Sequence, residues 1–213
     1  MIVREVMKTN VVCVTSETKA TDAKALMTEN KVTRLPVVDN GKLVGLVTKS
    51  DLNKAEPSAA TTLDMFEISS LLAKLTVKKV MSKKVVTVSP DEVVEEAARI
   101  MVDNNVSCLP VIKDGALVGI ITENNLFSLF IEMFGARTKG VRAVVYVDDK
   151  PGQLAKVTKE ISDAKANIIS AVTTKHDAEN KTCITLKATG IKEAQLKQIL
   201  EDCGYVIQDI RVI

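Results

Sequence analysis

The feature that most constrains the fold of this chain is an internal repeat with a spacing of 74 residues. Residues 3–52 align without a gap on residues 77–126, and 19 of the 50 aligned positions are identical. Chance would give roughly 3 identities, so the alignment indicates a duplicated unit. The identical positions include the segments Leu35–Val37 and Leu109–Val111 and the glycines Gly45 and Gly119.

Each copy predicts a β-α-β-β-α unit that opens with a short extra helix. The dipeptides Asn40-Gly41 and Asp114-Gly115 predict tight hairpin turns. In the second copy, Ser89–Glu92 predicts a helix start with Pro90 at the first helical position. A unit of this size buries little surface alone, so we expect the two copies to fold as a pair. The first strand of the two copies is predicted at Val11–Val14 and at Val85–Val88.

The third predicted strand of each copy ends at a Thr, and a closing helix follows. In Gly45–Asp51 and Gly119–Asn125, the Thr and the residue three positions later share one side of the first helical turn. Backbone N–H groups are expected to be unpaired there, which suits a phosphate, while a carboxylate suits a sugar diol. The alternative is a plain helix cap, although Asp is expected to be too short to complete a reciprocal capping box.

The last third of the chain predicts a different module, because the repeat does not extend into it. Its pattern is β-α-β-β-α-β, the split βαβ arrangement of ferredoxin-like folds. The predicted fold class is therefore mixed α/β (α+β). We expect the chain to be divided into a first copy at 1–60, an amphipathic linker helix at 61–76, a second copy at 77–134, a linker at 135–140 and a ferredoxin-like domain at 141–213.

Composition and charge indicate an ordinary globular protein. Apolar residues make up 46% of the 213 residues and charged ones 26%, with a net charge of +2. Neither nucleic acid nor an anionic membrane is a predicted partner, and no apolar run is long enough to span a bilayer. Three of the four cysteines lie in apolar, strand-like runs, which predicts reduced core thiols and a cytoplasmic location. These are Cys13, Cys108 and Cys183, with Cys203 the fourth.

Catalysis finds little support in the residues. The sequence contains no nucleophile elbow, no phosphate-binding P-loop and no His-Glu-x-x-His pattern. The only histidine, His176, falls in a predicted polar turn, where a surface role is expected rather than a metal or base role. We therefore expect no enzyme activity, no catalytic residue, no metal and no catalytic cofactor.

The repeated unit resembles the CBS (cystathionine-β-synthase-type) domain, through the Gly-h-h-Thr-x-x-Asp motif (h, apolar) and the Leu-Pro-Val segment before each hairpin. A tandem pair resembles a Bateman module, which implies binding of an adenosine-containing ligand such as AMP, ATP or S-adenosylmethionine between the copies. The nucleotide-binding residues that the resemblance implies are Val12, Thr33, Arg34, Thr48, Lys49, Asp51, Val86, Ser107, Cys108, Thr122 and Asn125.

The resemblance also implies distinct roles and two unequal clefts. Asp51 is expected to hold the ribose hydroxyls, with Thr48 beside the phosphate and valines such as Val86 against the base. Asn125 replaces Asp51 in the second copy and is expected to accept a weaker hydrogen bond from a hydroxyl. We therefore expect the Asp51 cleft to bind more tightly. The alternative for Arg34 and its neighbour Lys49 is that both are solvated surface charges.

The C-terminal module resembles the ACT domain. This resemblance rests on the loop Asp149–Leu154 and on an asparagine at the start of the second strand. It implies side-by-side dimerisation and an amino-acid site at the dimer interface, although a Pro-Gly turn also has a purely structural explanation. The implied ligand residues are Asp149, Pro151, Gly152, Gln153, Leu154 and Asn167.

A CBS pair followed by one ACT domain resembles the acetoin-utilisation proteins of AcuB type. This combination predicts a ligand-sensing regulatory homodimer that controls a separate enzyme. The alternative is a structural adaptor that dimerises and docks a partner without binding any small molecule.

Overall fold

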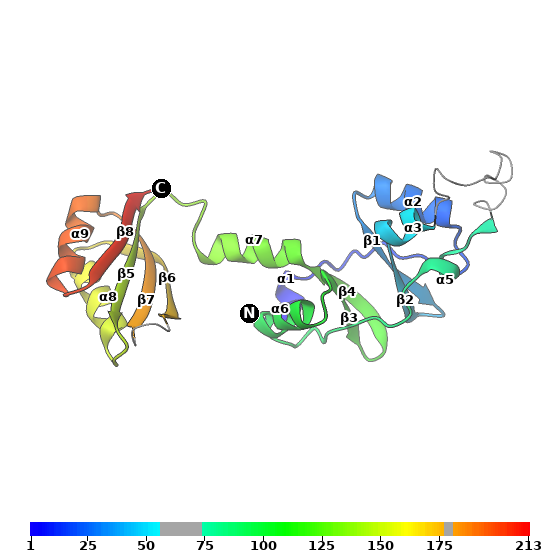
Figure 1. Cartoon of the computed structure of the whole chain (residues 1–213), viewed down its shortest axis with the longest axis horizontal. Helices are drawn as coiled ribbons and strands as arrows, with labels where there is room; N and C mark the ends of the chain where they lie inside the picture. The colour runs from blue at the N-terminus through cyan, green and yellow to red at the C-terminus, as the bar shows by residue number, and fades with distance from the viewer. Residues whose placement is uncertain (56–73, 177–180) are drawn as a thin grey trace. The chain divides into compact units, whose positions relative to one another are not determined.

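The structure, a computed structural model of the chain, describes residues 1–55, 74–176 and 181–213 (Figure 1). It divides into two compact units, Met1–Leu126 and Phe127–Ile213, which are taken in turn. Most of the predicted linker helix at 61–76 lies outside the described residues. The prediction that His176 falls in a polar turn is wrong for that residue, which ends a strand and pairs with Lys181, and residues 177–180 of the predicted turn lie outside the described residues.

The first unit contains the two sequence copies, and corresponding elements occupy corresponding positions in both. In each copy the two long strands form an antiparallel hairpin, and two helices contact the hairpin or each other. The elements of the first copy are α1 (Val3–Val6), α2 (Ala20–Glu29), β1 (Arg34–Asp39), β2 (Lys42–Thr48) and α3 (Lys49–Lys54). Those of the second are α5 (Val77–Val80), α6 (Val94–Asp103), β3 (Cys108–Lys113), β4 (Ala116–Thr122) and α7 (Glu123–Met133).

Both predicted hairpin turns are confirmed. Asn40 and Gly41 have φ of 50° and 77°, the positive values that a type I′ turn requires, and the second turn matches. The register that follows places Arg34 opposite Thr48 in β1–β2, and the same register holds between β3 and β4. Each hairpin therefore places the Thr of its motif opposite the first residue of the other strand: Thr48 opposite Arg34, and Thr122 opposite Cys108.

Two local predictions for the copies are wrong. The predicted first strands are reduced to single parallel bridges, Val14 with Val37 and Val88 with Val111. Helix α6 begins at Val94 and not at Pro90. The N-terminal segment accounts for the later start, because it hydrogen-bonds to this turn: the N–H groups of Val3 and Arg4 donate to the carbonyls of Glu92 and Pro90 at 2.9 and 3.0 Å.

The opening helices are exchanged between the two copies. Val77 of α5 is fully buried in the first copy's core, beside residues such as Leu35 and Val47. Val3 of α1 is fully buried in the second copy's core, beside residues such as Leu109. Each copy thus completes the other's core, which explains in packing terms why the pair is the folding unit.

The exchange also brings backbone against backbone at Gly119 and Gly45. Lys8 and Ile120 exchange two backbone hydrogen bonds of 2.9 Å beside Gly119, and Ser82 and Leu46 form the same pair beside Gly45. A Cβ added at Gly119 would lie 2.5 Å from Met7 Sδ and 3.0 Å from the Lys8 carbonyl oxygen. These two positions therefore have no room for a side chain.

The second unit confirms the predicted ferredoxin-like pattern. Its four antiparallel strands lie in the order β6-β7-β5-β8, so β6 and β8 are the sheet edges. The two helices α8 and α9 lie on one face, where residues such as Val157, Ile161, Leu196 and Leu200 form the core (Figure 1). The elements are β5 (Val141–Asp148), α8 (Gln153–Asp163), β6 (Asn167–His176), β7 (Lys181–Thr189), α9 (Glu193–Asp202) and β8 (Val206–Val212).

The four cysteines are free thiols, but the expectation of a buried Cys13 is wrong. Cys13 is exposed because its segment is not a paired strand, whereas Cys108 and Cys203 are buried and Cys183 is half-buried. Burial raises the pKa of the Cys108 thiol, which keeps it protonated near neutral pH.

A carboxylate between two arginines predicts pH-dependent stability of the second unit. Asp209 accepts hydrogen bonds from Arg211 Nε at 3.0 Å and from Arg142 Nη1 at 3.2 Å. The Arg211 hydrogen bond, with smaller effects of both arginine charges, lowers the pKa of Asp209. A lowered pKa contributes stability above the unfolded-state pKa of about 3.9, and this stability is lost as pH falls through the folded-state pKa.

We therefore expect Asp209→Asn to lower the melting temperature at neutral pH and to converge with the wild type as the pH falls below about 4. Thermal unfolding of both proteins between neutral and acidic pH measures the difference. The matched control is Asp163→Asn, which removes an exposed carboxylate of α8 and should have little effect. A melting difference for Asp209→Asn that stays constant down to acidic pH would contradict this account.

Candidate functional site

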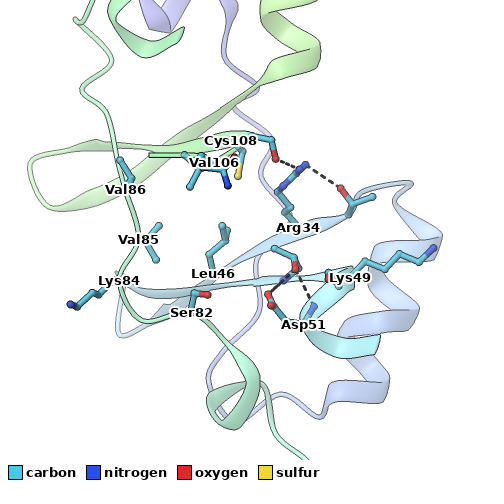
Figure 2. A pocket seen from close by; sticks show the side chains of 15 residues that line it. Arg34, Leu46, Lys49, Asp51, Ser82, Lys84, Val85, Val86, Val106 and Cys108 are labelled. Carbon is cyan, nitrogen blue, oxygen red and sulfur yellow. Dashed lines mark hydrogen bonds between the residues drawn. The ribbon is translucent and has the colours of Figure 1, made fainter. Parts of the chain in front are cut away.

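A cavity of about 390 Å³ lies between the two copies in the first unit (Figure 2). This volume falls within the usual range for small-molecule pockets. From the first copy it is lined by Thr33, Arg34, Leu46, Thr48, Lys49, Ser50 and Asp51. From the second copy it is lined by Ser82, Lys84, Val85, Val86, Asn105, Val106, Ser107 and Cys108.

Asp51 lies at the start of α3 and forms a reciprocal capping box with Thr48. Its Oδ2 accepts from the Thr48 N–H at 2.9 Å and from Thr48 Oγ1 at 2.7 Å. The Asp51 N–H donates to Thr48 Oγ1 at 3.1 Å. The expectation that Asp is too short for this box is therefore wrong, because the extended Thr48 backbone brings its N–H within reach.

The expected cluster of unpaired N–H groups is also wrong in the main. The N–H groups of Thr48 and Asp51 are used by the capping box, and the Lys49 N–H donates to the Thr33 carbonyl at 2.9 Å. In the second copy, the Glu123 N–H likewise donates to Ser107 at 3.1 Å. Attraction for an anion must therefore come mainly from side chains.

One oxygen of Asp51 remains available after the cap has formed. Oδ2 carries both capping bonds, and no other described residue donates to Oδ1. Asp51 is half-buried at the pocket wall, so Oδ1 is a charged acceptor beside the cavity. The capping interpretation and the binding interpretation of this residue are therefore compatible, because each uses a different oxygen.

Arg34 crosses from the first copy to the second. Its Nη2 donates to Ser107 Oγ, and its Nη1 donates to Thr33 Oγ1 at 3.2 Å. Lys49 and Lys84, in contrast, are exposed and extend away from the middle of the pocket (Figure 2). Arg34 is thus half-buried and hydrogen-bonded to both copies, whereas Lys49 is exposed.

Aliphatic side chains from both copies form the opposite part of the pocket. Leu46, Val85, Val86 and Val106 are half-buried and point toward the same space (Figure 2). The buried Cys108 thiol lies beside them. The pocket therefore combines an apolar wall with an arginine and a carboxylate, the combination that a nucleoside phosphate needs.

The pocket gathers eight of the eleven predicted nucleotide-binding residues. The other three, Val12, Thr122 and Asn125, are the repeat counterparts of Val86, Thr48 and Asp51 and lie outside it. The predicted set lacks the other seven lining residues, Leu46, Ser50, Ser82, Lys84, Val85, Asn105 and Val106. Val85 was missed because side chains alternate along a true strand, whereas this segment is unpaired and turns two successive valines to the pocket.

Asn125 lacks the free acceptor oxygen that Asp51 has. Its Oδ1 accepts from the Thr122 N–H at 3.0 Å and from Thr122 Oγ1 at 2.7 Å, so the amide oxygen is occupied by the cap. The group left over is Nδ2, which can only donate. The expectation that Asn125 accepts a hydrogen bond from a sugar hydroxyl is therefore wrong.

In the second unit, two cavities flank the loop between β5 and α8. One of about 390 Å³ includes Pro151 with Lys156 and Tyr205, and one of about 500 Å³ includes Asp149 with Leu154 and Thr173. Gly152 and Gln153 line both. Five of the six predicted ligand residues are thus together.

Asn167 is the exception. It pairs with Thr189 at one end of the sheet, while the loop follows Asp148, which pairs with Lys181 at the other end. Eight residues of strand separate the two ends, or roughly 26 Å. A single chain therefore does not bring Asn167 to the loop.

No helix in the described part of the chain is both long and apolar enough to span a membrane. No group of three or more His, Cys, Asp or Glu side chains there is placed to hold a metal ion.

Comparison with known proteins identifies both parts of the chain. The CBS domain family matches residues 3–58 and 77–132, and the TTHA0829-like ACT domain family matches residues 139–211. A homoserine O-acetyltransferase from Methanosalsum zhilinae is 36% identical over 126 residues, 58% of this chain and 23% of that protein. Protein MJ1426 from Methanocaldococcus jannaschii is 31% identical over 155 residues, 62% of this chain and 92% of that protein. The match thus spans about a quarter of the acetyltransferase.

Solved structures match the CBS part. The CBS pair of protein MJ0100, in complex with 5′-methylthioadenosine and S-adenosyl-L-methionine, is 27% identical with a TM-score of 0.52 and covers 65% of this chain and 98% of that one. CBSX2 in complex with AMP is 32% identical with a TM-score of 0.50, covering 61% and 96%. A Vibrio cholerae protein described as an acetoin utilization protein (AcuB) is 30% identical with a TM-score of 0.54, covering 64% and 95%.

Two of these structures similar to the CBS part thus contain adenosine compounds, and the AcuB structure matches the CBS part of this chain. The two matched CBS segments cover more than half of the residues. This chain belongs to the CBS-domain family, with a tandem CBS pair followed by a C-terminal ACT-like domain.

Proposed function

We propose that this protein is a ligand-sensing regulator whose CBS pair binds one adenosine-containing ligand in the pocket of Arg34 and Asp51. The observation that carries the proposal is the pocket itself, in which an apolar wall, a held arginine and a half-occupied carboxylate meet. The similar CBS structures that contain AMP, 5′-methylthioadenosine or S-adenosyl-L-methionine support the adenosine class.

Each part of such a ligand has a matching group. Asp51 Oδ1 accepts from the ribose hydroxyls, and a charged acceptor makes these bonds about twice as strong as a neutral one. Val85, Val86 and Val106 pack on the faces of the adenine ring. Arg34 and the hydroxyls of Thr33 and Ser107 face the 5′ end, where a phosphate would exchange with the present Arg34–Ser107 bond.

The proposal is tested by a thermal-shift and calorimetric screen of the full chain with adenosine, 5′-methylthioadenosine, AMP, ATP and S-adenosylmethionine. A ligand at 100 times its dissociation constant should stabilise the fold by about 2.7 kcal/mol. If no adenosine compound shifts the melting temperature, the sensor proposal fails and a structural adaptor becomes the better account.

The variant Arg34→Gln distinguishes the contribution of the phosphate to binding from that of the nucleoside. Loss of a charge-assisted hydrogen bond costs about 1.5–3 kcal/mol, so AMP should bind roughly tenfold or more weakly. The uncharged 5′-methylthioadenosine should bind almost unchanged, and it therefore serves as the matched control ligand. Equal losses for both compounds would show that Arg34 supports the fold of the pocket and not the phosphate.

For the ACT-like domain we propose dimerisation and an amino-acid site completed by a second copy. β6 is a sheet edge, with Asn167 at one end and the loop of Asp149–Leu154 near the other. Antiparallel pairing of two β6 edges would bring Asn167 of one chain toward the loop of its partner. The residues that a single chain keeps apart would then form two equivalent sites.

This arrangement predicts complementation between mutant chains. Asn167→Ala and Asp149→Ala chains should each lose amino-acid binding, and a mixed dimer should regain one intact site of two. Calorimetry with a set of amino acids, alongside sedimentation of each sample, measures both properties. A monomer that binds an amino acid would contradict the shared site.

We also propose that the protein controls a separate enzyme, and acetoin utilisation is the first pathway to test. The similarity of the CBS part to the Vibrio cholerae AcuB structure supports this choice. Growth on acetoin of a strain that lacks the gene, complemented by wild type or by Asp51→Asn, tests it directly.

A further inference from the structure

In the chain, the helix α7 connects the CBS pair to the ACT-like domain. The boundary between the two compact units falls inside α7, between Leu126 and Phe127. Within the described part of the chain none of its 11 residues is fully buried, and the side chain that packs on the second copy's core is the half-buried Leu126 in its first turn. Further contacts lie near its two ends.

At its start, α7 is attached to the pocket through Ser107. The Ser107 hydroxyl accepts from Arg34 Nη2, and the Ser107 carbonyl accepts from the Glu123 N–H at 3.1 Å. Glu123 is the first residue of α7, and Asn125 caps the same turn. A ligand that takes Arg34 away from Ser107 therefore acts on a residue bonded directly to the helix.

At its end, α7 is attached to the ACT-like sheet through Lys187. This lysine on β7 is only 2% exposed, and its Nζ donates to the Gly135 carbonyl at 2.9 Å. The Ser170 hydroxyl donates to the Phe134 carbonyl at 3.4 Å. Gly135 lies two residues beyond Met133, the last residue of α7, and a buried ammonium needs such a carbonyl partner.

The contact is close as well as charged. Gly135 has φ of +56°, and a Cβ added there would lie 2.3 Å from Ile169 Cγ2. The chain beyond α7 is thus pressed against β6 and bonded to β7 by a buried lysine. No other buried lysine is found in the described residues.

We infer that Lys187 is a positioning residue through which α7 transmits the ligand state of the pocket to the ACT-like sheet. The inference rests on the proposed adenosine binding. A ligand transmits a change only if it prefers one arrangement of Ser107 and the first turn of α7. Because Lys187 fixes the far end, movement of the helix acts on β7 and is not lost in the chain that follows.

The test is hydrogen exchange of the full chain with and without saturating AMP, with AMP affinity measured separately by calorimetry. In the wild type, AMP should change the exchange rate of β7 amides by a factor of about two or more. Lys187→Met keeps the volume but removes the bond, and it should lose most of this change while its AMP affinity stays within about twofold. The matched control is Lys197→Met on the exposed face of α9, which should respond like the wild type.

A second pair of variants tests the helix without touching Lys187. Ser128→Pro interrupts α7 midway, where no side chain is buried, and should uncouple β7 from AMP in the same way. Ser128→Ala keeps the helix and should retain the response. This pair decides the question even if Lys187→Met folds poorly.

The outcomes separate the inference from the proposed function. If wild type and controls bind AMP and respond at β7, while Lys187→Met and Ser128→Pro bind AMP and do not respond, the inference stands. If AMP binds and the interrupted helix still transmits, only the inference falls. If AMP and the other adenosine compounds fail to bind the wild type, the proposed function falls and the inference falls with it.

Discussion

Replacing Asp51 with Asn should weaken the binding of adenosine compounds by roughly 10- to 150-fold while leaving the fold intact. The estimate corresponds to the loss of one hydrogen bond to a charged group, about 1.5–3 kcal/mol. Asn at this position turns the free acceptor Oδ1 into a donor Nδ2, because the amide oxygen must take the capping bonds.

The second copy shows that the capping half of the interaction survives this change. Asn125 keeps the bonds from the Thr122 N–H and hydroxyl at 3.0 and 2.7 Å. Asp51→Asn should therefore melt close to the wild type, whereas Asp51→Ala should lose both the cap and the ligand. A missing cap costs about 1 kcal/mol.

The reciprocal variant, Asn125→Asp, is the matched control. It gives the second turn a free carboxylate oxygen and should strengthen any nucleoside binding there, raising the calorimetric stoichiometry toward two per chain. Calorimetry of all four proteins with AMP reports affinity and stoichiometry together. If Asp51→Asn bound AMP as tightly as the wild type, the carboxylate would have only its capping role.

Replacing Gly119 with Ala should destabilise the CBS pair by about 1–3 kcal/mol, the usual cost of overpacking. The new methyl group would lie 2.5 Å from Met7 Sδ and 3.0 Å from the Lys8 carbonyl. The sulfur lies on a flexible side chain, but the carbonyl belongs to a backbone that Ile120 holds with two hydrogen bonds of 2.9 Å. The clash with the backbone therefore cannot be relieved by a rotamer change.

Chemical denaturation of the single and double variants measures this cost. Met7→Ala combined with Gly119→Ala removes the sulfur and should recover only part of the loss. Gly45→Ala, with the same surroundings of Met81 and Ser82, should behave alike. Wild-type stability in Gly119→Ala would mean that the exchanged segments are not clamped together as described.

Much of the fold could be predicted because local chemistry specifies it. Asn40-Gly41 and Asp114-Gly115 adopt the positive φ angles that tight hairpins need, and both hairpins form where expected. The β-α-β-β-α-β order of the last module follows from apolar periodicity and is confirmed by the chain order β5, α8, β6, β7, α9, β8. Turn preferences and periodicity depend on near neighbours in the chain, so one sequence is enough to show them.

The candidate site was only partly predictable, because its remaining groups depend on partners distant in sequence. The capping box uses the Asp51 N–H, and the Thr33 carbonyl accepts from the Lys49 N–H. The second of these hydrogen bonds depends on how the start of β1 lies against the start of α3. Similarly, the position of Val85 at the pocket depends on the exchange of the opening helices. Neither feature can be predicted from the spacing of residues along the chain.

The sequence by itself thus determined the duplication, the two kinds of module and the residue types at both motif turns, since these are properties of order and local conformation. Only the tertiary structure decided which oxygen of Asp51 stays free, which group of Asn125 is left over, and that Lys187 is buried against the end of α7. The physical reason is that a hydrogen-bonding group satisfied by one partner is unavailable to another, and long-range packing selects the partner.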